Sequence, residues 1–168
     1  YQRKTMPARL LGEALGLSLM ETAQWQGEWT VVPVPLHPAR QRERGYNQSA
    51  VIARALSNKM GFRTNPNMLK RLRQTKTQTE LNREERLQNV AGAFCLGRGT
   101  SVLGIQVLLV DDVITTGATA CSCARILLEE GANRVVIAAV SRPELGDDAR
   151  AVGLKTPLER NGIEGQPH

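Results

Sequence analysis

One segment carries most of the structural information in this chain of 168 residues: Val107-Leu-Leu-Val-Asp-Asp-Val-Ile-Thr-Thr-Gly-Ala-Thr119. It begins with four apolar residues that do not alternate with polar ones, a pattern typical of a strand buried on both faces of a parallel sheet. The apolar run ends in Asp111 and Asp112, and a polar loop then leads into a helix predicted over 118–130. Because open α/β sheets bind ligands at the carboxyl ends of their strands, we predict that both carboxylates lie at a binding edge.

The loop after these carboxylates has the composition of a phosphate-binding site. Gly117 lets the backbone turn tightly and approach a ligand with no Cβ in the way. Free amides at a helix start favour a phosphate dianion, and vicinal sugar hydroxyls donate hydrogen bonds to carboxylates. The segment therefore predicts a site for a ribose 5-phosphate, with the sugar on Asp111 and Asp112 and the phosphate on Thr115, Thr116, Gly117, Ala118 and Thr119.

Each half of this pattern has a simpler interpretation when it is taken alone. An acidic pair after a strand is typical of a turn, and threonines before a glycine are typical of a helix N-cap. Together, between a buried strand and a helix, they favour phosphate binding. The chain has neither the G-K-[ST] ending of a Walker loop nor the G-x-G-x-x-G fingerprint, so neither of those nucleotide-binding motifs is predicted.

The rest of the pattern predicts an α/β domain. A strand, a helix and a strand over 106–110, 118–130 and 134–140 predict a right-handed parallel crossover. Before this unit we expect a helix from Pro7 to about Met20 and a strand over 31–35, whose prolines place it at a strand end or a sheet edge. An arginine-rich loop reaching Gly45 follows, and then a helix that is capped by Asn47 or Ser49 and ends at Gly61. A charged helix over 81–90 and a brief strand over 93–96 complete the predicted elements. Residues 1–143 are predicted as one domain, and residues 144–168, which show neither period, as a poorly structured tail.

Composition narrows the class of protein. With 41% hydrophobic and 23% charged residues the chain resembles ordinary globular proteins, and no apolar run is long enough to span a bilayer. We find no secretory signal. The chain has three cysteines, Cys95, Cys121 and Cys123, and their number and spacing fit neither a disulfide framework nor a zinc knuckle. We therefore predict reduced thiols in a cytoplasmic protein. The net charge of +6 favours an anionic partner. Since only 4% of the residues are aromatic, phosphate ligands are favoured over a nucleic-acid strand stacked on aromatic rings.

The acidic pair and the loop resemble the signature of the type I phosphoribosyltransferases, which bind 5-phosphoribosyl 1-diphosphate. More narrowly, the chain resembles the ComF/GntX family in that motif and in two others. The first of these is the basic segment from Pro33 to Ser49. The second is the pattern Arg73-x-Thr75-x-x-Gln78-x-x-Leu81, followed by Arg86-x-x-Asn89 and Ala93-Phe94. The resemblance covers about residues 8–143. It implies a type I phosphoribosyltransferase-like fold, with a mostly parallel twisted sheet flanked by helices. Members of the family often carry an amino-terminal zinc module, which here would precede residue 1.

The resemblance also implies roles for the matched positions. Asp111 and Asp112 would bind the ribose hydroxyls at the catalytic centre, and residues 115–119 the 5-phosphate. The segment 34–40, with Val34, Pro35 and Arg40, would face the diphosphate. Residues 73–86 would overlap a mobile lid, with Arg73 as the favoured catalytic cation. Mg²⁺ is the implied cofactor, and because the diphosphate and water would supply most of its ligands, no metal site made by the protein itself is expected.

Two functions remain open at this point. The first is an enzyme that transfers phosphoribosyl from 5-phosphoribosyl 1-diphosphate to an acceptor that the sequence does not identify. The second is a non-catalytic competence protein that uses the same fold to bind nucleotide or DNA alongside the DNA-uptake machinery, a hypothesis based on the family's association with natural competence. Because sheets of this kind often pair, a homodimer is a candidate assembly.

Overall fold

The structure, a computed structural model, describes residues 2–22, 25–73, 92–141 and 155–159. Its helices and strands are, in chain order, α1 (Gln2–Thr22), β1 (Trp29–Pro33), α2 (Pro38–Arg44), α3 (Gln48–Met60), β2 (Arg63–Thr64), β3 (Leu69–Arg71), β4 (Phe94–Leu96), β5 (Gln106–Val113), α5 (Ala118–Glu129), β6 (Arg134–Ser141) and β7 (Lys155–Glu159). Within these ranges, no helix combines the length and the apolar character that a bilayer crossing requires.

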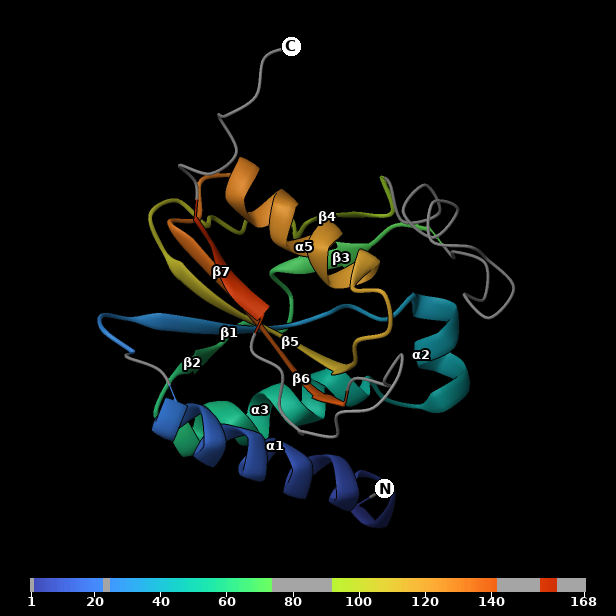
Figure 1. Cartoon of the computed structure of the whole chain (residues 1–168). Helices are drawn as coiled ribbons and strands as arrows, with labels where there is room; N and C mark the ends of the chain where they lie inside the picture. The colour runs from blue at the N-terminus through green and yellow to red at the C-terminus, as the bar shows by residue number, and fades with distance from the viewer. Residues whose placement is uncertain (1, 23–24, 74–91, 142–154, 160–168) are drawn as a thin grey trace.

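Five strands of the described chain form one mostly parallel sheet in the order β2-β1-β5-β6-β7. β1 pairs in parallel with β2 and β5, β5 pairs in parallel with β6, and β7 runs antiparallel to β6. β3 and β4 form a separate antiparallel pair. Figure 1 shows α1 and α3 on one side of the sheet and α5 with β3 and β4 on the other. The predicted fold class, a mostly parallel sheet flanked by helices, is confirmed.

β5 is central to the core because it contributes to both of its halves. Val107 and Leu109 lie in the apolar cluster on the α5 side, and Leu108 and Val110 lie in the cluster on the α1 and α3 side. All four side chains are 0% exposed. A strand covered on both faces needs an apolar residue at every position, which explains the lack of alternation. The prediction of a doubly buried strand is therefore confirmed.

The order of the strands marks the place where a ligand can enter. From β1 the chain passes through α3 and returns as β2 on one side of β1, whereas from β5 it passes through α5 and returns as β6 on the other side. The direction of winding therefore reverses between β1 and β5, with α3 and α5 on opposite faces (Figure 1). In doubly wound sheets ligands bind outside the carboxyl ends of the strands at such a reversal. This rule selects the ends of β1 and β5.

Several elements lie where the sequence predicts them. Asn47 is the N-cap of α3, and Gly61 ends that helix in the left-handed region with a φ of 70°. The strands predicted over 93–96 and 134–140 are β4 and β6, and the helix predicted over 118–130 is α5. β5 continues past its predicted end at 110 because its backbone pairs with β6 as far as the partners Val113 and Ser141.

Two predicted boundaries in the amino-terminal half are wrong. α1 begins at Gln2 instead of Pro7, so that Pro7 lies inside the helix and removes one donor from its hydrogen bonds. β1 ends at Pro33 instead of Pro35 and lies between β2 and β5. Of the two alternatives predicted for its prolines, the strand end is therefore correct and the sheet edge is not.

The prediction of an arginine-rich loop before Gly45 is also wrong, because residues 38–44 form α2. His37 caps this helix, and its Nδ1 accepts a hydrogen bond from Ala39 N at 3.2 Å. Pro38 occupies the first turn, where a missing N–H leaves no intrahelical bond unmade. Gly45 closes the other end with a φ of 82°. Favourable residues at both ends thus stabilise a helix whose interior shows no apolar pattern.

α1 packs on α3 through two glycines, Gly12 and Gly16, as well as through larger apolar side chains. Leu15 and Leu19 are buried, but Leu10 is 54% exposed although it belongs to the apolar pattern that predicts the helix. The buried side includes Gly12, where a Cβ would lie 2.5 Å from the carbonyl oxygen of Ile52 on α3. The absence of a side chain at this position lets the two helices approach closely.

Two predictions, for the middle and the carboxyl-terminal part of the chain, fall largely on residues that the structure does not describe. The charged helix predicted over 81–90 lies outside the described residues. Most of the predicted tail, 144–168, lies outside them too, but Lys155–Glu159 forms β7 and extends the sheet beside β6. The division of the chain at residue 143 stays a prediction.

We expect Gly12→Ala to lower the stability of the protein although alanine is the better helix former. In an unhindered helix interior alanine is more favourable than glycine by about 1 kcal/mol. Here the new Cβ would lie 2.5 Å from Ile52 O and 2.9 Å from Ala55 Cβ, and overpacking of this kind costs about 1–3 kcal/mol. Thermal unfolding should therefore show a Tm lowered by about 2–4 °C for each kcal/mol lost.

Gly16→Ala is the matched control for this experiment. A Cβ at position 16 would lie 3.1 Å from Lys59 Cβ, a milder contact, so this variant should lose less stability than Gly12→Ala. A Tm for Gly12→Ala above that of the wild type would contradict the close contact between α1 and α3.

Candidate functional site

Hydrogen bonds hold the carboxyl ends of β1 and β5 and the start of α3 together. Val34 N donates to Val110 O at 2.8 Å, which continues the pairing of β1 with β5 by one residue. Asn47 Nδ2 donates to Val34 O at 3.0 Å, while Asn47 Oδ1 accepts a hydrogen bond from Ser49 N at 3.1 Å. The first turn of α3 is thus fixed against the segment that follows β1.

The two carboxylates at the end of β5 have different surroundings. Asp111 is 8% exposed, and its Oδ1 accepts hydrogen bonds from Ser49 Oγ at 3.1 Å and from Asp112 N at 2.9 Å. Asp112 is half-buried, and its Oδ1 accepts a hydrogen bond from Val113 N at 2.9 Å. Asp112 is therefore the carboxylate that a ligand reaches more easily, whereas Asp111 is bound largely by the protein itself.

Burial, followed by the adjacent charge of Asp112, raises the pKa of Asp111 from 3.8 to about 7. Hydrogen bonds from Asp112 N and from Ser49 favour the charged form and act in the opposite direction. Near neutral pH this carboxyl group therefore changes between its protonated and ionised forms. In the protonated form it can donate a hydrogen bond as well as accept one.

The loop after β5 leaves the start of α5 open to a ligand. Gly117 precedes the helix with a φ of 78°, and in the described part of the chain no side-chain hydrogen bond caps it. Thr116 Oγ1 accepts only a long hydrogen bond, 3.4 Å, from Ala118 N. Thr115 is exposed and Thr119 half-buried, so hydroxyl groups border the same turn. Backbone amides at such a helix start, together with the helix dipole, favour an anion.

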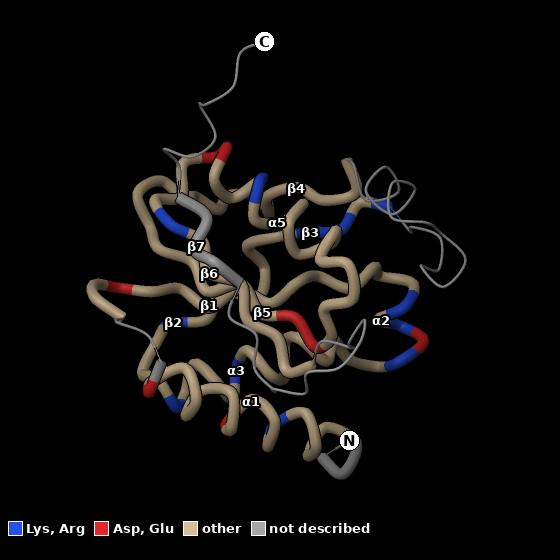
Figure 2. Tube along the Cα trace, viewed as in Figure 1, with Lys and Arg blue, Asp and Glu red and all other residues tan. Residues whose placement is uncertain are grey.

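Two arginines bring positive charge to this edge of the sheet. Arg71, at the end of β3, is half-buried, and its guanidinium carbon lies 5.3 Å from the ring centroid of Phe94 on β4. Burial lowers the pKa of Arg71, the charge of Arg40 lowers it further, and the charge of Asp111 raises it. Arg40 and Asp111 therefore both lie within electrostatic range of Arg71. Figure 2 shows the acidic end of β5 and the basic residues of α2 at the same end of the molecule.

The structure places most of the predicted site residues along one edge. Val34 and Pro35 follow the end of β1, Arg40 lies on the adjacent α2, and residues 111–119 follow the neighbouring strand. Arg73, in contrast, is exposed and lies beyond the end of β3. Residues 74–91 lie outside the described chain, so the predicted lid and the role of Arg73 in it stay predictions.

Sequence reasoning missed Ser49 and Arg71 as members of this site. The sequence offers Asn47 and Ser49 as alternative caps of α3; since Asn47 caps the helix, the Ser49 hydroxyl is available to Asp111. Arg71 lies among other basic residues, Lys70, Arg73 and Lys76, and residue type alone does not show which of them reaches the site. The alternation along β3, with Leu69 buried and Lys70 exposed, is the signal that could have separated Arg71 from its neighbours.

Burial makes Cys123 unsuitable as a nucleophile for the site. Cys123 is 0% exposed, and burial raises the pKa of its thiol above the ordinary value. A protonated thiol is a poor nucleophile. Cys95 and Cys121 are free and half-buried. Cys123 therefore belongs to the core, whereas Cys121 is only partly buried.

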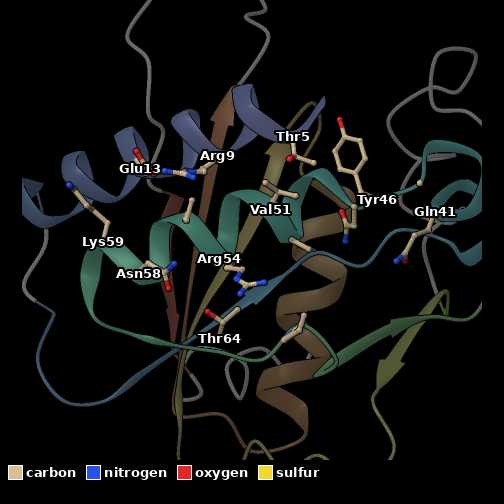
Figure 3. A pocket seen from close by; sticks show the side chains of 15 residues that line it. Thr5, Arg9, Glu13, Gln41, Tyr46, Val51, Arg54, Asn58, Lys59 and Thr64 are labelled. Carbon is tan, nitrogen blue, oxygen red and sulfur yellow. The ribbon is translucent and has the colours of Figure 1, made fainter. Parts of the chain in front are cut away.

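A surface pocket of about 1120 Å³ runs along α3 between α1 and β2 (Figure 3), and Asn47 at the start of α3 also lines it. Arg9 and Glu13 line it from α1, Arg54 and Asn58 from α3, and Thr64 from β2. None of the residues predicted to hold the ribose, the phosphate or the diphosphate lines this pocket. The edge formed by the ends of β1 and β5, where carboxylates, amides and cations meet, is therefore the candidate site.

Together, the winding reversal and the acidic and phosphate-loop motif at the carboxyl end of β5 define a domain of the type I phosphoribosyltransferase class. A family model described as "Phosphoribosyl transferase domain" matches residues 47–155. The chain belongs to this family and, within it, to the ComF family.

Individual relatives agree with this assignment. The chain is 32% identical over 146 residues to competence protein F of Haemophilus influenzae, an alignment that covers 84% of this chain and 64% of that protein. It is 36% identical over 107 residues to the DNA utilization protein YhgH of Salmonella typhi, which covers 64% of this chain and 46% of that protein. The chain thus spans between 46% and 64% of the length of these curated relatives.

A solved structure supports the fold. The glutamine phosphoribosylpyrophosphate amidotransferase from B. subtilis, complexed with ADP and GMP, superposes with a TM-score of 0.51 at 22% sequence identity. The match covers 79% of this chain and 25% of that one. At this identity the likeness shows the fold alone.

We expect Asp111→Asn to stabilise the protein increasingly as the pH rises. A carboxyl group whose pKa is higher in the folded chain contributes stability that is fully present below 3.8 and lost as the pH rises through about 7. Asparagine keeps an oxygen that accepts the hydrogen bonds from Ser49 and Asp112 N, but it has no charge to bury. The difference in unfolding free energy between variant and wild type should therefore grow with pH, by at most about 1.4 kcal/mol per pH unit.

Denaturant unfolding at a series of pH values across this range measures the difference. Glu129→Gln, at the exposed end of α5, is the control and should show no such trend, because its side chain is 58% exposed. A difference between Asp111→Asn and wild type that stays constant across the range would show that Asp111 is ionised throughout.

Proposed function

We propose that this chain binds 5-phosphoribosyl 1-diphosphate with Mg²⁺ and transfers the phosphoribosyl group to a nucleophilic acceptor. The observation that carries the proposal is the meeting of three kinds of group at one sheet edge. The carboxylates of Asp111 and Asp112, the start of α5 and the cations Arg40 and Arg71 all lie at the carboxyl ends of β1 and β5. They match the hydroxyls, the 5-phosphate and the diphosphate of the sugar donor.

Each group has one task in this proposal. Asp112, the more accessible carboxylate, accepts hydrogen bonds from the ribose hydroxyls, and Asp111 with Ser49 holds it in place. The amides and hydroxyls of residues 115–119 bind the 5-phosphate. Arg40 and Arg71 face the diphosphate across the segment that begins at Val34 and Pro35. Arg73 is the further cation that the family resemblance implies for the same group.

The reaction would break the bond between C1 of the ribose and the diphosphate oxygen. The electron pair leaves with the diphosphate, and C1 gains oxocarbenium character, as in glycoside hydrolysis. A lone pair of the acceptor forms the new bond to C1, and the proton of the acceptor passes to a base. Carboxylates beside the ribose stabilise positive charge on the sugar, and arginines stabilise negative charge on the leaving group.

The described residues fit a magnesium ion that is carried by the substrate. They contain no group of three or more His, Cys, Asp or Glu side chains that could hold a metal ion by themselves. Mg²⁺ binds through one or two carboxylates, substrate phosphates and water, and the adjacent Asp111 and Asp112 can supply the carboxylate share. When bound, the ion would neutralise charge on the departing diphosphate.

Calorimetric titration with 5-phosphoribosyl 1-diphosphate and Mg²⁺ tests the proposal. Asp112→Asn should weaken binding about 10- to 100-fold, because hydrogen bonds to a charged group contribute about 1.5–3 kcal/mol. Release of diphosphate in the presence of a range of acceptors should fall with it. Glu129→Gln, at the other end of α5, should bind like the wild type. A wild type that binds no sugar donor, or an Asp112→Asn variant with unchanged affinity, would contradict the assignment.

The same titration separates Arg71 from the other arginines. Arg71→Gln removes the half-buried cation beside Asp111, so it should weaken binding of the diphosphate donor more than that of ribose 5-phosphate. Arg42→Gln, an exposed position on α2, is the matched control and should leave both affinities unchanged. Equal losses for the two ligands would place Arg71 away from the diphosphate.

A second candidate function is supported by the names of the relatives and by the charge of α2. A competence protein and a DNA utilization protein are among the relatives, and α2 carries the arginines Arg40, Arg42 and Arg44 within one short helix. Under this hypothesis the chain binds DNA without catalysis. Binding to DNA should then weaken steeply as salt increases, and Arg42→Gln with Arg44→Gln should reduce that slope by about two phosphate contacts. If no complex forms at low ionic strength, this candidate is excluded.

A further inference from the structure

The surface pocket along α3 is a groove whose floor is set by the sequence of that helix. Residues four apart share one face of a helix, and two neighbouring rows of such residues on α3 face the groove. The first row is Ala50, Arg54 and Asn58, and the second row is Val51, Ala55 and Lys59. α1 borders the groove on one side and Thr64 of β2 on the other (Figure 3). Because three of the six lining residues of α3 are alanine or valine, the surface is hollow between these neighbours.

The groove has the size of a site for a small organic molecule. Its volume of about 1120 Å³ is close to the upper end of the range of about 300–1,000 Å³ in which such sites usually lie. From Ala50 to Lys59 the helix rises about 13 Å. A single phosphate ion would leave most of this length empty, so the groove suits a longer ligand.

The lining of the groove has an excess of positive charge. Three basic side chains, Arg9, Arg54 and Lys59, and one acidic side chain, Glu13, belong to the described residues that line it. Glu13 Oε1 lies 3.0 Å from Nε of Arg9, so these two charges offset each other. Arg54 and Lys59 form no ion pair with any residue in the ranges that the structure describes. They lie on the two sides of α3 (Figure 3), and an anionic ligand between them would be attracted by both.

One end of the groove offers a surface for a flat ring. Tyr46, which is half-buried between α2 and α3, lines this end near Thr5 of α1 (Figure 3). Stacking of a nucleobase on an aromatic side chain contributes about 1–3 kcal/mol. From Tyr46 the apolar floor leads along α3 to Arg54 and then to Lys59. Aromatic and apolar surface is thus followed by two cations.

We propose that this groove binds a nucleotide that carries several phosphate groups. Its base stacks on Tyr46, and its phosphates contact Arg54 and Lys59. Inorganic phosphate or polyphosphate would make no use of the aromatic end. A nucleic-acid strand carries phosphates along its whole length and would place some of them on the apolar floor. No residue assigned to the sugar donor lines the groove, so this site is additional to the proposed function and does not depend on it.

The groove and the candidate phosphoribosyl site can be tested separately. They come closest at Asn47, which lines the groove and donates from Nδ2 to Val34 O at 3.0 Å. Arg54 and Lys59 lie further along α3, more than one turn after Ser49. Substitutions of these two residues leave the hydrogen bonds of Asn47 and Ser49 in place, so they report on the groove.

Calorimetric titration of the full chain with ATP tests the proposal. Arg54→Gln and Lys59→Gln should each weaken ATP binding about tenfold or more, because a hydrogen bond to a charged group contributes about 1.5–3 kcal/mol. Arg98→Gln, at an exposed arginine that does not line the groove, is the matched control and should bind ATP like the wild type. Binding of 5-phosphoribosyl 1-diphosphate should be the same in all three variants and should not displace ATP. Circular dichroism verifies that the variants are folded.

A second pair of variants tests the place of the base. Tyr46→Leu should weaken ATP binding about fivefold or more, because stacking on the ring is lost, but it should leave the binding of inorganic triphosphate unchanged. Tyr46→Phe keeps the ring and should bind ATP like the wild type.

Four results would overturn the proposal. The first is a wild type that binds no ATP, and the second is an ATP affinity that Arg54→Gln and Lys59→Gln leave unchanged. The third is displacement of ATP by the sugar donor, which would place the nucleotide in the candidate site. The fourth is a short oligothymidylate that binds in the groove more tightly than ATP, which would make the ligand a strand. A wild type that binds ATP in the groove but binds no sugar donor would contradict the proposed function and support this inference.

Discussion

The burial of β5 on both faces is the constraint on which the rest of the structure depends. Because residues 107–110 are fully enclosed, the sheet must be covered by helices on both sides and cannot present a face to water. Polar groups are then excluded from the middle of the sheet and can begin only where the strand ends. The acidic pair at 111–112 lies at the end of the enclosed part of β5, where a ligand can contact polar groups that the protein does not cover.

The position at which the enclosed part of β5 ends explains why Asp111 and Asp112 differ in burial. Asp111 is still within the enclosed part of the strand, so its charge is disfavoured and its oxygens are used by Ser49 and the backbone. Asp112, one residue further, is more accessible. A buried carboxyl group in an otherwise apolar strand weakens the folded state, and such local conflicts are typical of functional sites. Groups from opposite faces of the sheet, Ser49 on α3 and Arg71 beside α5, meet around this one side chain.

Much of the fold could be predicted because the conformation of its strands, caps and turns is set by residues that are adjacent in the sequence. The quartet at 107–110, the caps Asn47 and Gly61 and the left-handed Gly117 each follow from a few adjacent residues. The phosphate loop was predictable for the same reason. The proximity of Arg71 to Asp111 was not, since it depends on how β3 and β4 lie against the sheet. In α1, likewise, only the contact with α3 shows that Gly12 belongs to the buried side and Leu10 does not.

The side of β1 that faces β2 is a place where a strand of another molecule could pair with the sheet. Val31 O accepts a hydrogen bond from Asn65 N at 3.0 Å, so the backbone groups of Val31 point towards β2. Because every second residue of a strand directs its backbone groups to the same side, those of Pro33 point to this side too. β2 pairs only with Thr30 and Val31, which leaves the flank beside Pro33 without a strand in the described chain. Proline has no N–H, so an incoming strand would find no donor there. Pro33 thus removes one of the donors that a foreign strand would need in order to pair on this flank.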